Sequence, residues 1–236
     1  MTKETWYVLD TGHLDAATNM AIDEALLHFH SKKAIPPTIR FYGWERPSLT
    51  VGHFQNVEKT INFAGIKKHR CDFVRRLTGG NAVLHDNELT YSIIVSEAHP
   101  KIPQSINEAY FVLGQGILQG YLHLGIHAEF ALPDLKQRDR SAVCFETPAI
   151  YELIVDGKKV TGNAQTRKQG VLLQHGSIPL KFDVDMLFDL FAFSSEQVRE
   201  RQKAKFLQRA IAINDITGKT HTFTEVKEAF RAGFEV

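Results

Sequence analysis

The stretch Arg75-Arg76-Leu77-Thr78-Gly79-Gly80-Asn81-Ala82-Val83-Leu84-His85-Asp86 organises the rest of this sequence. β-prone residues stand on both sides, at Phe73-Val74 and from Leu89 to Val95, so the stretch predicts a turn between two strands. Gly79 and Gly80 have no Cβ atom, which allows a sharp turn and the close approach of another group. Bare N–H groups with an arginine beside them suit a phosphate or a carbonyl oxygen. The glycine pair alone is better explained as a tight turn beside two solvated arginines, because neither the P-loop motif nor the dinucleotide motif is present.

The composition is that of an ordinary globular protein. Hydrophobic residues make up 43% of the 236 residues, and 28 Lys and Arg against 27 Asp and Glu leave a net charge of +1. A nucleic-acid-binding protein is usually far more basic, so we expect no nucleic-acid partner. No apolar run reaches the ~18 residues that a membrane span requires, and residues 1–5 are not a signal peptide. Two cysteines make no disulfide framework, so we expect a reducing cytoplasm.

The strands are predicted from short runs of β-branched and aromatic residues. We expect them at 6–9, 38–42, 48–52 and 171–176, with 48–52 beside 38–42, and an extended segment at 126–132. Residues 151–155 and 158–162 flank Asp156-Gly157, which is the turn of a predicted β-hairpin. Residues 133–141, which follow the extended segment and precede the hairpin, are highly charged and are predicted to form an exposed loop that leads to Cys144.

The helices are predicted from apolar residues at helical spacing. Asp15 is the expected N-cap of the first helix. Ile22, Leu26 and Phe29 mark its expected buried face, which Met20 and Leu27 widen. A second helix is expected at 57–66, and a long one from Ile106 to Leu124 that ends at Gly125. The last third predicts helices at 184–191, 196–209 and from 224 onward. The chain then stops without a helix cap, so we expect a shortened C-terminus.

Strands mixed with amphipathic helices, without repeats or linkers, predict a single α/β domain over residues 1–236. We expect it to be a monomer, since nothing in the sequence suggests otherwise. Two local basic clusters, at 67–70 and 199–209, are either solvated helix faces or a guide for an acidic protein partner.

The central stretch and the Glu88-Leu89-Thr90-Tyr91-Ser92 that follows resemble the central motif of the lipoate–protein ligase, octanoyltransferase and biotin–protein ligase superfamily. Residues 19–27 are similar to its first helix. A second block, Cys144-Phe145 followed by residues 151–153 and 157–167, is similar to the LipM-type octanoyltransferases of Gram-positive bacteria. The resemblance covers nearly the whole chain. It implies the biotin/lipoate–protein ligase catalytic-domain fold, an α/β (α+β) fold with mixed β-sheets flanked by helices.

The resemblance also implies two catalytic residues, Cys144 as the acyl carrier and Lys159 beside it. A cysteine becomes nucleophilic when a nearby cation stabilises its thiolate, and the Asp156-Gly157 hairpin folds the chain back so that the two side chains can meet. Taken alone, Cys144 is more often a buried inert thiol and Lys159 a surface lysine. Cys71 matches no catalytic position of the family and is interpreted as structural.

The remaining site residues follow from the family pattern. The predicted acyl channel is lined by Gly79, Gly80, Asn81, Ala82, Val83 and Leu84, with Arg76 at its mouth, His85 on its wall near the thioester, and Gln165 and His175 shaping the carbonyl end. His85 is equally well explained as a strand histidine hydrogen-bonded to backbone, and Gln165 and His175 as packing residues. No cofactor is implied. A metal site is not expected, because Gly125 interrupts the helix that would align His123 with His127.

The implied reaction moves octanoyl from octanoyl–acyl carrier protein to Cys144, and then to a lysine of a lipoyl-accepting domain, that of glycine-cleavage H protein. Three alternatives stay open. An ATP-dependent lipoate–protein ligase would not need Cys144, and an amidotransferase would move octanoyl from H protein to dehydrogenase E2 domains with a similar cysteine. The third alternative is an acyl- or biotin-binding module without turnover.

Overall fold

A computed structural model of the protein describes residues 4–131 and 151–235. In chain order the elements are β1 (Tyr7–Leu14), α1 (Ala16–Ser31), β2 (Thr38–Trp44), β3 (Ser48–Val51), α2 (Phe63–Lys68), β4 (Asp72–Arg75), β5 (Val83–His85), β6 (Glu88–Ser96), α3 (Ile106–His123), β7 (Glu129–Phe130), β8 (Leu153–Val155), β9 (Lys158–Lys159), β10 (Gly162–Lys168), β11 (Val171–Pro179), α4 (Val184–Asp189), α5 (Glu196–Arg209), α6 (Ile213–Thr217) and α7 (Phe223–Gly233). Mixed sheets with helices around them confirm the predicted α/β class.

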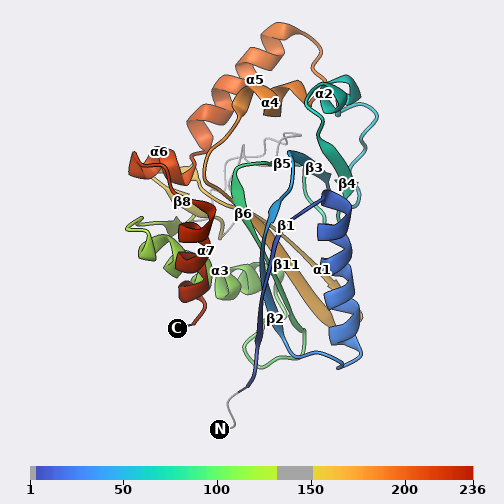
Figure 1. Ribbon diagram of the computed structural model, residues 1–236, viewed down its shortest axis with the longest axis vertical. Coiled ribbons are helices and arrows are strands. Elements are labelled where there is room, and N and C mark those ends of the chain that lie inside the picture. The colour runs from blue at the N-terminus through green and yellow to red at the C-terminus, as the bar shows by residue number, and fades with distance from the viewer. Residues whose placement is uncertain (1–3, 132–150, 236) are drawn as a thin grey trace.

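The largest sheet has five strands in the order β1-β2-β6-β11-β10. Helix α1 covers one face, and α3 and α7 lie on the other side (Figure 1). Because side chains alternate along a strand, β2 directs Phe41 toward the large apolar core under α3 and α7, and directs Arg40 and Tyr42 toward α1. The sheet therefore has an apolar face and a face that carries buried polar groups.

Strand β3 belongs to a second sheet, in the order β4-β3-β5, so the prediction that it neighbours β2 is wrong. The reason is that both edges of β2 are already occupied, by β1 and by β6. After Pro47, whose carbonyl accepts a hydrogen bond from the N–H of Asp72, the chain starts a parallel pairing with β4. An apolar cluster that includes Leu49 and Phe188 packs this sheet against α4 and α5.

The predicted buried face of α1 is only partly correct. Leu27 is buried and Met20 and Leu26 are partly buried, but the other buried residues are Ala16, Asn19 and Asp23, and Phe29 is exposed. Asn19 and Asp23 turn inward because both bind the buried Arg40 guanidinium of β2. Polar pairing across the α1–sheet interface therefore determines how the helix is rotated.

Most local end signals are confirmed. The Asp15 side chain accepts a hydrogen bond from the Thr18 N–H, Gly125 follows α3 with φ +74°, and Asp156 and Gly157 both have positive φ in the hairpin turn. Several boundaries differ from the predictions, among them those of β1, which extends to Leu14, and of β9, which ends at Lys159. Helix α2 begins only at Phe63, the 126–132 segment pairs as a strand only at β7, and α7 ends at Gly233 with a C-cap at Phe234.

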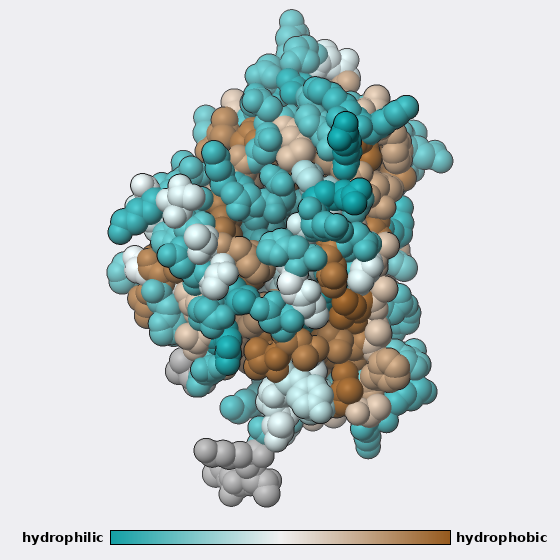
Figure 2. Space-filling model, viewed as in Figure 1, coloured by the Kyte–Doolittle hydropathy of each residue, from teal (hydrophilic) through white to brown (hydrophobic). Residues whose placement is uncertain are grey.

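Hydrophobic side chains gather on the visible face over the lower part of β1 and β2, whereas the surface over α5 is mostly hydrophilic (Figure 2). The exposed Val8 lies on β1, which is an edge strand of the five-stranded sheet. No helix in residues 4–131 or 151–235 combines the length and apolar character needed to cross a bilayer.

Candidate active site

A cavity lies between the five-stranded sheet and the β4-β3-β5 sheet, beneath the central stretch. Its lining residues come from α1, both sheets and the loop after β4: Met20, Tyr42, Trp44, Thr50, Arg76, Gly80, Val83, His85, Thr90, Gly162, Asn163, Ala164, His175, Gly176 and Ser177. Its empty volume is about 420 Å³, including the opening to solvent. Glycines and aromatic rings make up much of this lining, so the cavity suits a slender apolar ligand.

Arg76 is buried at the centre of the site and holds the glycine-bearing turn in place. Its Nη2 donates to the carbonyl oxygens of Gly79 and Asn81, at 2.8 and 2.7 Å. Its Nη1 donates to the carbonyl and hydroxyl oxygens of Thr50, and its Nε donates to the Thr78 hydroxyl at 3.1 Å. All five N–H groups thus have acceptors within the protein, so this guanidinium organises the cavity wall. The tight-turn interpretation of the glycine pair predicted that Arg75 and Arg76 are both solvated, but only Arg75 is exposed.

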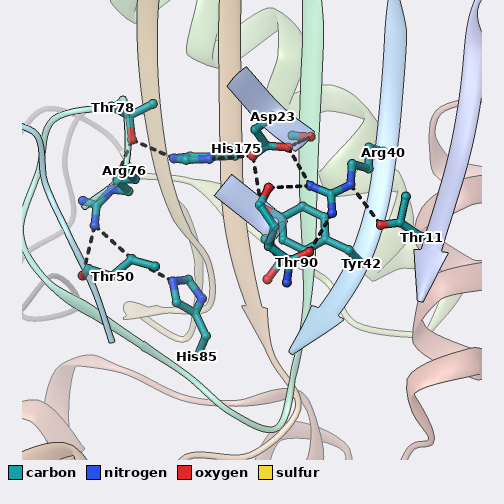
Figure 3. A network of polar contacts seen from close by, with 12 residues as sticks. Thr11, Asp23, Arg40, Tyr42, Thr50, Arg76, Thr78, His85, Thr90 and His175 are labelled. Carbon is teal, nitrogen blue, oxygen red and sulfur yellow. Dashed lines mark hydrogen bonds and ion pairs between the residues drawn. The ribbon is translucent and has the colours of Figure 1, made fainter. Parts of the chain in front are cut away.

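Two histidines connect to Arg76 through these threonines in the same manner (Figure 3). His175 Nε2 lies 2.6 Å from the Thr78 hydroxyl, and its Nδ1 lies 3.1 Å from Asp23. His85 Nε2 lies 2.9 Å from the Thr50 hydroxyl, and its Nδ1 lies 2.7 Å from Glu88.

This pattern assigns the tautomers. Each threonine oxygen accepts from Arg76, and among the described residues the hydroxyl hydrogen has no acceptor except the histidine Nε2. The proton of each imidazole is therefore on Nδ1, where it is donated to a carboxylate. Burial lowers the pKa of His175, although the hydrogen bond to Asp23 opposes this effect, so we assign a neutral ring.

The Asp23 carboxylate is the centre of the polar face of the large sheet. It accepts hydrogen bonds from Arg40 at 2.8 Å, from Ser92 at 2.8 Å and from the Tyr42 hydroxyl at 3.1 Å, in addition to His175. Burial would raise the pKa of Asp23, but the His175 hydrogen bond and the Arg40 charge outweigh burial and lower it. The carboxylate is consequently ionised and paired.

Only some of the predicted channel residues lie together. Gly80, Val83, His85, His175 and Arg76 line the same cavity. Ala82 and Leu84 point the other way along β5 and line a neighbouring cavity beneath α4 and α5, together with Val83. Gly79 and Asn81 contribute carbonyl oxygens to Arg76, and Gln165 donates to Gln174 beyond the cavity lining.

Sequence reasoning missed the cavity residues Tyr42, Trp44, Thr50 and Asn163. Trp44 stacks on the His85 ring with centroids 4.1 Å apart, and Thr50 joins His85 to Arg76. The available signal was the alternation in β2, where Tyr42 and Trp44 are two residues apart and both line the cavity. Thr50 on β3 and Asn163 on β10 had no such signal.

The lipoyl protein ligase A/B catalytic domain matches residues 15–235 of the chain. The chain is 54% identical over 241 residues to octanoyltransferase LipM of Bacillus subtilis (strain 168), a match that covers all of this chain and 87% of that protein. It is 55% identical over 242 residues to octanoyltransferase LipM of Anoxybacillus flavithermus, again covering all of this chain and 87% of the relative. The chain belongs to the octanoyltransferase LipM family. It is thus an acyltransferase by family.

Solved structures share this fold at lower identity. A bi-partite lipoate protein ligase from Thermoplasma acidophilum superimposes with a TM-score of 0.77 at 21% identity, covering 99% of this chain and 83% of that one. Lipoate-protein ligase A bound with ATP gives a TM-score of 0.70 at 22% identity, covering 99% and 85%. The expected lipoate–protein ligase catalytic fold is confirmed for this LipM-family chain.

In this LipM-family chain, Lys159 on β9 is a buried lysine, with 1% of its side chain exposed. Its Nζ lies 2.6 Å from the Glu152 carboxylate, and the β8–β9 hairpin places its backbone opposite Ile154. Cys144 lies outside the described residues, so its distance from Lys159 stays a prediction. The other cysteine, Cys71, is half-buried, and burial raises the pKa of its thiol to about 11, which suits a structural role.

In the described parts of this LipM-family chain, no group of three His, Cys, Asp or Glu side chains is arranged to bind a metal ion.

Proposed function

We propose that this protein is an octanoyltransferase of lipoate biosynthesis, in which Cys144 carries the acyl group and Lys159 assists both acyl transfers. The observation that carries the proposal is the burial of the Lys159 ammonium against Glu152, in a chain of the octanoyltransferase LipM family. Burying a lysine is costly unless it is paired, and such lysines are often functional.

The chain connectivity supports a meeting of the two side chains. The Ala131 N–H donates to the Glu152 carbonyl oxygen at 2.7 Å, and the Tyr151 N–H donates to the Ala131 carbonyl oxygen at 3.3 Å. Ala131 and Tyr151, the described residues that precede and follow the Cys144 segment in the sequence, are therefore close to Glu152, the partner of Lys159.

In the first step the Cys144 thiolate attacks the thioester carbonyl of octanoyl–acyl carrier protein. A new carbon–sulfur bond forms, the bond to the carrier sulfur breaks, and the carrier thiolate leaves and takes up a proton. The Lys159 ammonium stabilises the attacking thiolate. In the second step the ε-amine of an acceptor lysine attacks the Cys144 thioester and forms an amide, and the bond to the Cys144 sulfur breaks. Lys159 assists the transfer of the amine proton to the departing Cys144 sulfur.

We propose the cavity between the sheets as the binding site of the octanoyl chain. Its lining by Trp44, Val83 and Gly176 admits an alkyl tail, and the neutral histidines add no charge. The proposed acceptor is the lipoyl domain of glycine-cleavage H protein. The proposal also includes a monomeric enzyme in a reducing cytoplasm, where the Cys144 thiol stays free.

Intact-mass measurement tests the first step. Octanoyl–acyl carrier protein alone should add one octanoyl group that hydroxylamine removes, and Cys144→Ser should show no adduct. Lys159→Ala should slow adduct formation by about 10²-fold or more, the usual scale of acid–base assistance, whereas the control Lys158→Ala on the same strand should not. Equal transfer by wild type and Cys144→Ser would refute the mechanism.

Two further reactions separate the alternatives. Acylation from free octanoate that requires ATP would indicate a ligase. Acylation of dehydrogenase E2 domains from octanoyl-H protein, but not from octanoyl–acyl carrier protein, would indicate the amidotransferase.

A further inference from the structure

An exposed phenylalanine stands on a rigid turn beside the cavity. Phe54 has 89% of its side chain exposed, the largest fraction among the exposed large hydrophobic residues of the described chain. Exposed aromatic side chains of this size are frequent anchors in protein–protein interfaces. A single exposed ring is common on protein surfaces, so the surroundings of Phe54 decide whether it is an anchor.

The turn that carries Phe54 is held by the neighbouring Arg75. Arg75 Nη1 lies 2.6, 3.1 and 3.0 Å from the carbonyl oxygens of Gly52, His53 and Gln55. The Gln55 N–H closes the turn onto the Gly52 carbonyl oxygen at 3.0 Å. A single guanidinium thus fixes the backbone on both sides of Phe54, so little conformational entropy remains to be lost when a partner binds.

The same turn contacts the cavity wall. The His53 N–H donates to the Thr78 carbonyl oxygen at 2.9 Å, and a Cβ on Gly52 would lie 1.9 Å from the Gly80 carbonyl oxygen. Gly80 lines the cavity. Phe54 consequently stands directly beside the residues that border the site.

Two more exposed rings extend the surface. Phe73 and Arg75 are the exposed alternate residues of β4, so they share one face of that strand. Phe73 contacts Phe63 of α2 with ring centroids 5.4 Å apart, and both rings are partly exposed. We call Phe54, Phe63 and Phe73 the aromatic rim. Strand β4 and α2 lie together at one end of the molecule (Figure 1).

Exposed cations lie near the aromatic rim. Lys67 at the end of α2 and Arg70 just after it are exposed, and the exposed Arg75 follows Phe73 two residues later on β4. Aromatic anchors flanked by cations fit an acidic protein surface.

We propose that the aromatic rim docks the acidic protein domain that presents the acceptor lysine, an inference that rests on the proposed function. The acyl group of the donor arrives on the long pantetheine arm of its carrier, so the carrier body need not touch the edge of the cavity. A lysine side chain is much shorter. The acceptor domain itself must therefore contact the surface around Gly80, where Phe54 stands.

The test separates the two half-reactions. Wild-type protein is loaded with octanoyl, and transfer to the lipoyl domain of H protein is measured in single turnovers over a range of domain concentrations. Phe54→Ser should raise the half-saturating concentration at least tenfold, the effect of losing an interface anchor, and leave loading from octanoyl–acyl carrier protein unchanged. Arg75→Met, which releases the turn but keeps Phe54, should change the same quantity in the same direction.

Phe29→Ser is the matched control. Phe29 is 51% exposed on α1, thirteen residues beyond Ala16, whose N–H contacts Asp72 of β4. Thirteen residues of helix place it roughly 20 Å from that contact. This variant should transfer normally.

Four results would overturn the proposal: unchanged half-saturation in Phe54→Ser, a defect only in loading from the carrier protein, equal defects in both half-reactions, or an equal defect in Phe29→Ser. Failure of the wild type to form an octanoyl adduct would count against the proposed function instead. In that case, binding of the unmodified lipoyl domain to wild type and Phe54→Ser, measured by calorimetry, still decides on the aromatic rim: tenfold weaker binding supports it and equal binding refutes it.

Discussion

Replacing Asp23 with leucine should lower the free energy of unfolding by about 3–5 kcal/mol, because the Arg40 guanidinium would be buried without its carboxylate. Arg40 is fully buried and lies 2.8 Å from Asp23, with its guanidinium carbon 3.8 Å from the centre of the Tyr42 ring. The hydroxyls of Ser92 and Tyr42 would also lose an acceptor. For a chain of this length the loss corresponds to a fall in Tm of roughly 6–20 °C.

Urea unfolding followed by circular dichroism measures this change, and Asp185→Asn is the control. Asp185 pairs only with Lys203 among the described residues and has 81% of its side chain exposed, so its loss should cost less than about 1 kcal/mol. The double variant Asp23→Leu with Arg40→Met removes both charges, and it should recover more than half of the stability lost by Asp23→Leu. The reasoning is refuted if Asp23→Leu lowers the free energy of unfolding by less than about 1 kcal/mol. It is also refuted if the losses of the two single variants simply add in the double variant, because the two side chains would then not interact.

Three further predictions concern the individual residues His175, Cys71 and Gly176. Burial lowers the pKa of His175 below that of the unfolded chain, so the Tm should fall as the pH drops below about 6.5, and His175→Gln should flatten this dependence in calorimetry. The Cys71 thiol, with its pKa raised to about 11, should resist iodoacetamide at pH 8 in the folded protein, and rapid alkylation in peptide mapping would contradict this. Gly176→Ala places a Cβ 2.3 Å from Asn163 Oδ1, which should cost about 1–3 kcal/mol in urea unfolding, and a neutral result would show that the strands relax freely.

Local signals predicted a large part of the fold. The Asp15 cap, the Gly125 stop and the Asp156-Gly157 turn depend on a few neighbouring residues, and all three are as expected. Helix α5 has the predicted bounds, because Ser195 caps its start and Ala210 is already extended. Such features need no knowledge of the rest of the chain.

The errors concern contacts between distant segments. Hydrophobic spacing in α1 pointed to Ile22, Leu26 and Phe29, but it cannot detect a guanidinium arriving from β2. Asn19 and Asp23 are four residues apart on one helix face, which was the available signal for a buried polar stripe. The place of β3 depended on which strand edges were already paired, a property of the whole sheet.

The candidate site was predicted unevenly for the same reason. The glycine-bearing stretch is contiguous, so its residues were found together, but alternation along β5 divides Val83 and His85 from Leu84. The partners that orient His85 and His175 come from four separate elements and were not predicted as a network.

The network around the cavity contains two arginines, Arg40 and Arg76, and two carboxylates, Asp23 and Glu88. With both histidines uncharged, these formal charges cancel, so the wall has no net charge to attract or repel a ligand. Bringing an ionised head group into such an enclosure would forfeit its hydration without a counter-ion in return, whereas a hydrocarbon tail has no hydration of that kind to lose. For the proposed octanoyl ligand this predicts that the tail enters first and that the reactive carbonyl stays at the entrance.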